Sequence, residues 1–130
     1  APTVCVLGDL ALFHDQNGLL WSREPDCPVV FVLIDNDGGG IFHMLPIANH
    51  EPAFSKFFAT PHGLDFQHTA EMYNLGWSEL EIGALASELN AALESGRTSI
   101  LRVTSDREIN KRRHEEVADA VAQNVLDTLR

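Results

Sequence analysis

Two polar positions that follow apolar runs could together bind a divalent cation. Asp9 comes after TVCVL and one glycine, and Asn36 comes after PVVFVLI and one aspartate, 36 − 9 = 27 positions further along. Hard cations such as Mg²⁺ take oxygen ligands in an octahedral shell. Three of these positions can be filled by a carboxylate, an amide oxygen and a backbone carbonyl, which leaves the others for phosphate oxygens and water. The residue types therefore predict a metal site formed by Asp9, Asn36 and the carbonyl oxygen of Gly38.

Three consecutive glycines, Gly38 to Gly40, lie directly after the stretch DND. Because glycine lacks a Cβ, this run would let the chain turn sharply, direct a carbonyl at the metal and bring backbone close to a ligand. Taken alone, DNDGGG is typical of a flexible loop, and Gly-Asp after a strand is typical of a helix-capping turn. Their occurrence together, at the ends of two consecutive predicted strands, favours a functional site.

The elements expected to position these residues form a βαβ unit. The β-rich apolar runs at 3–7 and 28–34 predict strands that are buried on both faces of a parallel sheet. Between them LALFHDQNGLLW, residues 10–21, has the length and apolar content of a crossover helix. Because such crossovers are right-handed, both strands should end at the same edge of the sheet, where open α/β proteins bind ligands.

The alternation of strands and helices continues along the chain. Residues 43–64 are polar, contain proline and follow no regular period, which predicts a long loop. A short helix is expected in FQHTAEMYN, capped by Asp65 and ended by Gly76, and a strand is expected at 98–103. The alternation predicts one α/β domain, without internal repeats, low-complexity tracts or an evident linker.

Two longer helices are expected in the second half of the chain. Ser78 and Glu81 match an S-x-x-E capping box ahead of a helical apolar stripe that Gly96 closes. A last helix has one apolar face, formed by Val117, Val121, Ala122, Val125 and Leu129. Near its start is a basic cluster interspersed with acids, typical of a solvated face or a helix-start contact, with a subunit interface as the alternative. The cluster consists of Arg107, Lys111, Arg112 and Arg113.

Composition limits the compartment and the partners. The chain has 130 residues, 45% of them hydrophobic, which is enough for one core, and its longest apolar stretch is too short to cross a bilayer. Its net charge of −10 repels nucleic acids and anionic membranes, so an anionic ligand would need a metal, backbone N–H groups or another chain to hold it. A cytoplasmic location is expected, with Cys5 and Cys27 as buried thiols without a chemical role.

Several other kinds of site are excluded by their spacing. Counting from Asp35 puts Pro46 where an EF-hand calcium loop requires glutamate, and neither GxxxxGK[ST] nor GxGxxG occurs. No two of the six histidines have HxxxH spacing on one predicted helix, which argues against zinc. His43, beside the predicted pocket, could contact a substrate.

The stretch GDLALFHDQNGL followed by DNDGGGIFHMLP resembles the thiamine-diphosphate enzymes, whose motif is Gly-Asp and, further along, Asn. Most of these enzymes have GDG and NN, from which Leu10 and the Asn36-Asp37 pair depart. These departures resemble the 2-succinyl-5-enolpyruvyl-6-hydroxy-3-cyclohexene-1-carboxylate (SEPHCHC) synthases of menaquinone biosynthesis, as do GGGIFHMLP and FQHTAEMYNL.

The resemblance implies a fold and roles for individual residues. The fold is a three-layer α/β/α domain with a mainly parallel sheet, the C-terminal diphosphate-binding domain of a longer protein, so residues 1–130 are expected to be an excised piece. Asp9, Asn36 and the Gly38 carbonyl would bind Mg²⁺ or Mn²⁺. The remaining cofactor and pocket positions would be Gly8, Leu10 and Asp37 at the diphosphate, and Ile41, Phe42 and Leu45 along an apolar wall around the thiazolium ring and the substrate.

The resemblance also implies a reaction, the decarboxylation of 2-oxoglutarate followed by addition of the succinyl unit to isochorismate. No catalytic residue is expected here, because the glutamate that activates the cofactor belongs to a missing N-terminal domain, usually of a second subunit in a homodimer or homotetramer. The fragment alone should be inactive. The alternatives are a 2-oxoacid decarboxylase or acetolactate-synthase-like enzyme, and a non-catalytic binding module on the same scaffold.

Overall fold

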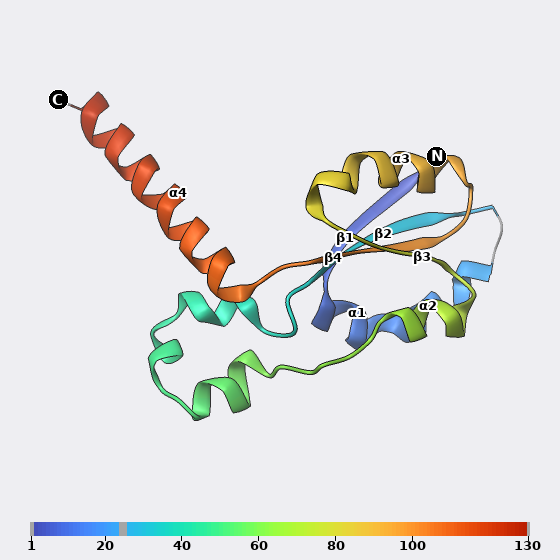
Figure 1. Ribbon diagram of the computed structural model, residues 1–130, viewed down its shortest axis with the longest axis horizontal. Coiled ribbons are helices and arrows are strands. Elements are labelled where there is room, and N and C mark those ends of the chain that lie inside the picture. Colours follow the sequence, from blue (N-terminus) through green and yellow to red (C-terminus); the bar gives the residue numbers. More distant parts are fainter. Residues whose placement is uncertain (1, 24–25, 130) are drawn as a thin grey trace.

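A parallel sheet of four strands organises the chain, with the strands in the order β1-β2-β4-β3 (Figure 1). The computed structural model describes residues 2–23 and 26–129. Every strand predicted from the sequence is present, together with one that was not predicted, β3. The strands are β1 (Thr3–Gly8), β2 (Val29–Asp35), β3 (Gly76–Leu80) and β4 (Ser99–Thr104).

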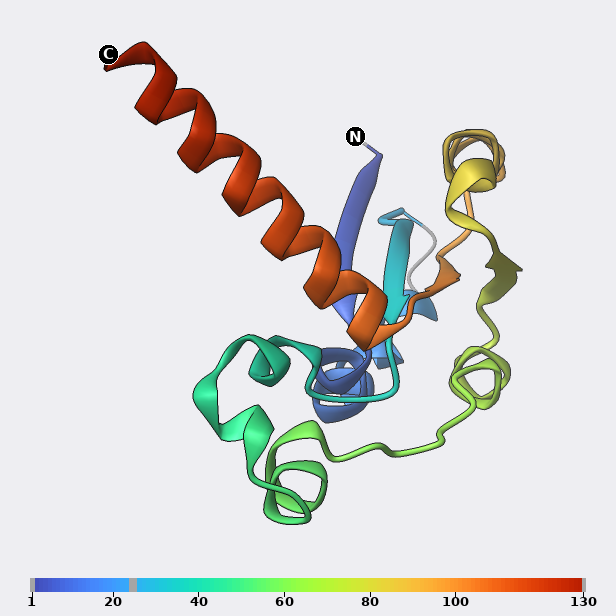
Figure 2. The same cartoon turned by 60° about the vertical axis from the view of Figure 1, so that its left-hand side comes forward.

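Helices cover both faces of this sheet and complete three layers. One face carries α1 (Asp9–Asp15) and α2 (Gln67–Tyr73), and the opposite face carries α3 (Leu85–Glu94) (Figure 1). The last helix, α4 (Arg107–Thr128), projects away from the sheet (Figure 2). The predicted three-layer α/β/α class is therefore confirmed.

Alternate side chains of the two central strands form two cores, as expected for strands that are covered on both faces. Leu33 and Ile100 point toward α1 and α2, and both are 0% exposed. Val30 and Leu101 point to the other side, where the apolar residues of α3 pack against them. The strand prediction for 28–34 is thus confirmed, since β2 is buried along nearly its whole length.

Leu33→Ala is expected to lower the free energy of unfolding by about 3 kcal/mol, because it leaves a cavity in a fully packed site. Val6→Ala removes apolar surface from a side chain that is 67% exposed and should cost less than about 0.5 kcal/mol. Urea unfolding of the two variants measures both values. Equal losses would contradict the placement of Leu33 in the core.

Strand β1 is not buried on both faces, so that part of the prediction is wrong. Among the described residues it pairs with β2 alone, which makes it an edge strand. Val4 and Val6 lie on the same face as Val30 and Val32, but α3 packs over the inner strands and leaves the two β1 valines exposed. The prediction of two buried thiols also fails, because Cys27 is exposed and Cys5 only half-buried.

The predicted helix at 10–21 is divided into two kinds of helix. Helix α1 ends at Asp15, and residues Gln16–Arg23 form a 3₁₀ segment. Asn17 and Gly18 are poor α-helix formers, which explains the change at this point. Residues 43–64 contain only short 3₁₀ and π turns, which agrees with the prediction of a long irregular loop.

The boundaries of α2 and α3 differ from the predictions. Asp65 does accept a hydrogen bond from the amide of Gln67 at 2.9 Å, but Asn74, with a left-handed φ of 56°, ends α2 in place of Gly76. Ser78 lies within β3, so no capping box forms. A 3₁₀ turn (Ile82–Ala84) precedes α3 instead. Pairing with β4 determines the structure of residues 76–80 more strongly than their local signal for a helix start.

Helix α4, the predicted last helix, carries a large amount of exposed apolar surface. Asp106 accepts a hydrogen bond from the amide of Ile109 at 2.8 Å, which caps the helix. None of the described residues of α4 is buried, and its apolar face is exposed along its length. No helix among the described residues is long and apolar enough to span a membrane.

Candidate functional site

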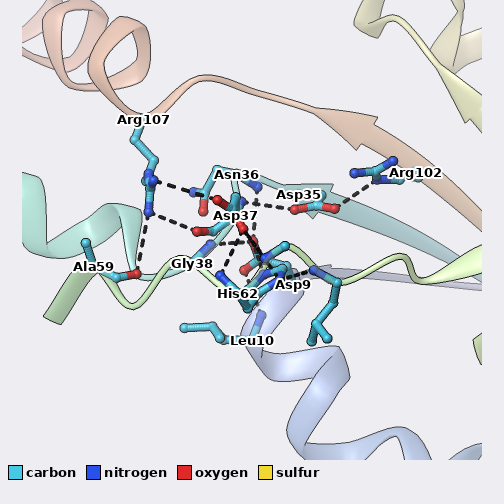
Figure 3. A network of polar contacts seen from close by, with 12 residues as sticks. Asp9, Leu10, Asp35, Asn36, Asp37, Gly38, Ala59, His62, Arg102 and Arg107 are labelled. Atoms are coloured by element: carbon cyan, nitrogen blue, oxygen red, sulfur yellow. Dashed lines mark hydrogen bonds and ion pairs between the residues drawn. The ribbon is translucent and has the colours of Figure 1, made fainter. Parts of the chain in front are cut away.

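The carboxylate of Asp9 lies at the point where β1 and β2 end, and it holds the loop that follows β2 (Figure 3). Its Oδ2 accepts hydrogen bonds from the amides of Asn36, at 3.1 Å, and Gly38, at 2.8 Å. Its Oδ1 accepts one from the amide of Leu10 at 2.7 Å. The right-handed crossover thus brings together the two segments that the sequence pairs across 27 positions.

Asp9 is ionised at its position, although it is only 3% exposed. Burial by itself would raise the pKa of the carboxyl group, but the amides of Gly38 and Leu10 stabilise the charged form and hold the pKa below its ordinary value. A buried carboxylate that stays charged is the kind of group that attracts a cation.

The oxygens near Asp9 fit a hard divalent cation. Asn36 Oδ1 is buried and, among the described residues, has no hydrogen-bond partner, which is uncommon for a buried amide oxygen. The carbonyl of Gly38 accepts a hydrogen bond from the amide of Gly40 at 2.9 Å and keeps a second lone pair. An orphaned amide oxygen, a charged carboxylate and a partly free carbonyl are the oxygen donors that Mg²⁺ prefers.

The three glycines are required by close contacts within the chain. A Cβ on Gly38 would lie 2.2 Å from the carbonyl oxygen of Ala59, and a Cβ on Gly39 would lie 2.3 Å from that of Phe58. Gly38 also has a φ of +129°, which other residues rarely adopt. The close contacts that the structure shows here are with residues 58–60, where the amide of Gly39 donates a 2.8 Å hydrogen bond to the carbonyl of Ala59. The close approach of this backbone to a ligand stays a prediction.

Asp37 holds a second segment against the loop. Its backbone is left-handed, with a φ of 60°, and its Oδ1 accepts hydrogen bonds from the amides of His62 at 2.9 Å and Gly63 at 2.7 Å. The amide of Gly63 is the main reason why the pKa of the Asp37 carboxyl group lies below its ordinary value. The carboxylate of Asp37 therefore binds backbone amides of the same chain.

His62 is a member of the site that the sequence did not indicate. Its Nδ1 accepts a hydrogen bond from the amide of Leu64 at 3.0 Å, and its Nε2 lies 3.2 Å from Asp9 Oδ2. The geometry at Nε2 is not that of a directed hydrogen bond. No motif surrounds His62, and only the fold brings it to Asp9, 53 positions away.

A second group of possible metal ligands consists of Asp9, Asp35 and His62, whose ligand atoms lie within 4.8 Å of one another. Asp35 is poorly suited to such a role, because its Oδ2 pairs with the guanidinium of Arg102 at 2.8 Å, and a positive group so close neutralises the carboxylate and repels a second cation. The chain's chemistry thus favours the set that contains Asn36, whose oxygen is free.

A buried ion pair supports the loop from the sheet. Arg102 in β4 binds Asp35 at 2.8 Å and the exposed Glu79 in β3 at 3.1 Å. Burial opposes the charge on Arg102, but the carboxylates of Asp35 and Glu79 together outweigh it and raise the pKa of the guanidinium. The sequence did contain a signal for this residue, an arginine within the apolar strand SILRVT.

The other predicted residues border the loop. Gly8 precedes α1 and Leu10 lies in its first turn. In the predicted apolar wall, Ile41 is 71% exposed and Leu45 is also exposed, whereas Phe42 packs against Phe58.

His43 is a buried neighbour of Phe54 and Glu108. Its ring is buried against Phe54, and its Nε2 lies 3.4 Å from Glu108 at the start of α4.

Comparison with known proteins finds relatives of this chain among the SEPHCHC synthases. No protein-family model matches the chain. The SEPHCHC synthase of Halobacterium salinarum is 44% identical over 121 residues, which are 92% of this chain and 21% of that protein. The chain is homologous to one segment of these synthases. The synthase of Salinibacter ruber is 41% identical over 125 residues, 95% of this chain and 21% of its own length. The resemblance seen in the sequence is therefore confirmed, and the chain spans about a fifth of the length of the curated relatives it matches.

Solved structures share the fold at lower identity. Benzoylformate decarboxylase from Polynucleobacter necessarius superposes with a TM-score of 0.66 at 21% identity, over 82% of this chain and 20% of that one. A thiamine diphosphate-dependent 4-hydroxybenzoylformate decarboxylase from Rhodococcus jostii gives 0.60 at 20% identity, over 79% and 19%. These two decarboxylases thus share the fold of this chain over about a fifth of their own length.

Proposed function

We propose that residues 1–130 are the C-terminal, diphosphate-binding domain of a SEPHCHC synthase. The complete protein would decarboxylate 2-oxoglutarate and add the succinyl unit to isochorismate in menaquinone biosynthesis. The observation that carries this proposal is the contact of Asp9 with the DNDGGG loop, in a chain that is 44% identical to the synthase of Halobacterium salinarum.

The residues of the loop would hold a cation and, through it, thiamine diphosphate. Asp9, the free oxygen of Asn36 and the carbonyl of Gly38 would bind Mg²⁺ or Mn²⁺, which would join a chain of net charge −10 to an anionic diphosphate. When bound, thiamine diphosphate supplies the carbon–carbon bond chemistry, and the protein binds and orients it. Gly8, Leu10, Asp37 and Ile41 would border the cofactor.

An apolar wall would lie beside the reacting part of the cofactor. The turn after the glycines presents Ile41 and Leu45 outward, and Phe42 is fixed behind them by Phe58. Exposed aliphatic side chains on a rigid turn suit a surface that excludes water from a bound ring. These three residues are proposed as the part of the substrate pocket that this domain contributes.

The remainder of the site would come from other parts of the protein. The chain is about a fifth as long as its relatives. The apolar face of α4 is exposed, and so is the face of β1 that carries Val4 and Val6. Proteins normally cover apolar surfaces of this kind. We propose that the missing N-terminal domains and a second subunit, in a cytoplasmic homodimer or homotetramer, supply the activating glutamate and the cations for the substrates. The domain alone would then be inactive.

A decarboxylase is the second candidate, because both solved neighbours are named as decarboxylases. The complete protein should be incubated with 2-oxoglutarate, Mg²⁺ and thiamine diphosphate, with and without isochorismate, and the products identified. We expect a succinylated product that requires isochorismate. Carbon dioxide and an aldehyde as the only products would favour the decarboxylase, and no cofactor-dependent reaction would favour a binding module.

A further inference from the structure

We propose that Arg107 is a positioning residue, which fixes the loop that would bind the cation and so sets the affinity for it. This inference rests on the proposed function. Arg107 is the first residue of α4 and reaches back across the end of β2 to the loop, where it lies next to Asp37 and Ala59 (Figure 3). It belongs to the basic cluster for which the sequence suggested a solvated face or a helix-start contact, with a subunit interface as the alternative.

The guanidinium joins the two segments that meet at the glycines. Nη1 donates a hydrogen bond to the carbonyl of Asp37 at 2.9 Å and a longer one to the carbonyl of Ala59 at 3.5 Å. Nη2 lies 4.0 Å from the carboxylate of Asp37. One side chain thus connects the DNDGGG loop with residues 58–60, and a hydrogen bond from a charged donor is stronger than one between neutral groups.

The peptide unit between Asp37 and Gly38 is held at both ends. Its carbonyl accepts from Arg107, and its N–H, on Gly38, donates to Asp9 at 2.8 Å. Two hydrogen bonds on opposite sides fix the plane of this peptide and with it the direction in which Gly38 continues. The carbonyl of Gly38 is the proposed third ligand, so Arg107 orients a ligand that it does not touch.

Two of the glycines lie against this arginine. A Cβ on Gly38 would lie 3.2 Å from Arg107 Nη1, which is a tight contact, and a Cβ on Gly40 would lie 3.4 Å from its Cγ, which is an ordinary one. Both the head and the stem of the side chain therefore pack against the loop. The backbone at Asp37 and Gly38 has positive φ angles of 60° and 129°, conformations that persist only where surrounding contacts impose them.

The test uses the complete protein and Mn²⁺ as the probe, because bound and free Mn²⁺ differ in electron paramagnetic resonance and no turnover is needed. Arg107→Met keeps the stem and removes the donors. We expect its dissociation constant for Mn²⁺, with thiamine diphosphate present, to rise at least about tenfold, as when outer-shell partners of metal ligands are removed. Arg107→Lys should recover part of the affinity, because its ammonium can still donate to the carbonyl of Asp37.

Arg112→Met, an exposed arginine on the same helix, serves as the matched control and should bind Mn²⁺ like the wild type. Wild-type affinity in Arg107→Met would overturn the inference, even if its thermal midpoint fell, because a merely structural arginine changes stability alone. Failure of the wild type to bind Mn²⁺ with thiamine diphosphate would overturn the proposed function as well, so the two failures are distinguishable.

Discussion

Asp9→Ala in the complete protein should weaken the binding of thiamine diphosphate with Mg²⁺ at least about a hundredfold, which corresponds to on the order of 3 kcal/mol. The variant loses a charged ligand and also the acceptor of the amides of Asn36 and Gly38, so the loop that carries the other two ligands loses its main support. Calorimetric titration of the cofactor into wild type and variant measures the change.

Asp15→Ala is the control for this experiment, because it removes an exposed acid from the same helix without touching the loop. Its affinity for the cofactor should equal that of the wild type. If Asp9→Ala bound the cofactor as tightly as Asp15→Ala, the assignment of Asp9 to the cation site would be wrong.

Gly38→Ala should destabilise the chain by about 3 kcal/mol or more, through overpacking combined with backbone strain. The added methyl group would lie 2.2 Å from one backbone carbonyl oxygen and 2.9 Å from the next, at a φ of +129°. Neither neighbour is the end of a flexible side chain, so the loop and residues 58–60 would have to separate. Urea unfolding followed by tryptophan fluorescence measures the loss.

Gly83→Ala provides the matched control, because a Cβ at Gly83 meets no atom within 4 Å and its φ is unrestrictive. It should change the free energy of unfolding by less than about 0.5 kcal/mol. Similar losses for the two variants would mean that the loop does not pack against residues 58–60 as described.

Periodic patterns predicted the central part of the fold, and local signals failed where pairing between strands decided the structure. The run PVVFVLI forms a strand covered on both faces, because an unbroken apolar run can be satisfied only there. The equally apolar TVCVL forms an edge strand, since its composition says nothing about how many neighbours it has. Ser78 and Glu81 match a helix start, but the register with β4 places Ser78 in a strand.

The candidate site was predictable to the extent that chain topology determines it. The crossover rule brings Asp9 to the loop at Asn36, and the structure places them in contact. His62 reaches the same place from a segment without a motif, so only the packed chain reveals it. The sequence marked Arg102 as an arginine within an apolar strand and Arg107 as a member of a basic cluster, but only the packed chain reveals their contacts. The glycine run was expected to admit a ligand, which stays a prediction. The tight contacts that the structure shows at these glycines are with residues 58–60, Arg107 and the side chains of Asn36 and Phe42.

The most direct test of the central claim is a calorimetric titration of thiamine diphosphate with Mg²⁺ into the complete protein and its Asn36→Ala variant. Asn36 Oδ1 has no hydrogen-bond partner among the described residues, so its removal deprives the fold of no known hydrogen bond at that atom, and the thermal midpoint should stay close to that of the wild type. We expect the wild type to bind and the folded variant to lose cation-dependent binding. Unchanged binding in Asn36→Ala would mean that the DNDGGG loop is structural and that this chain holds its ligand elsewhere.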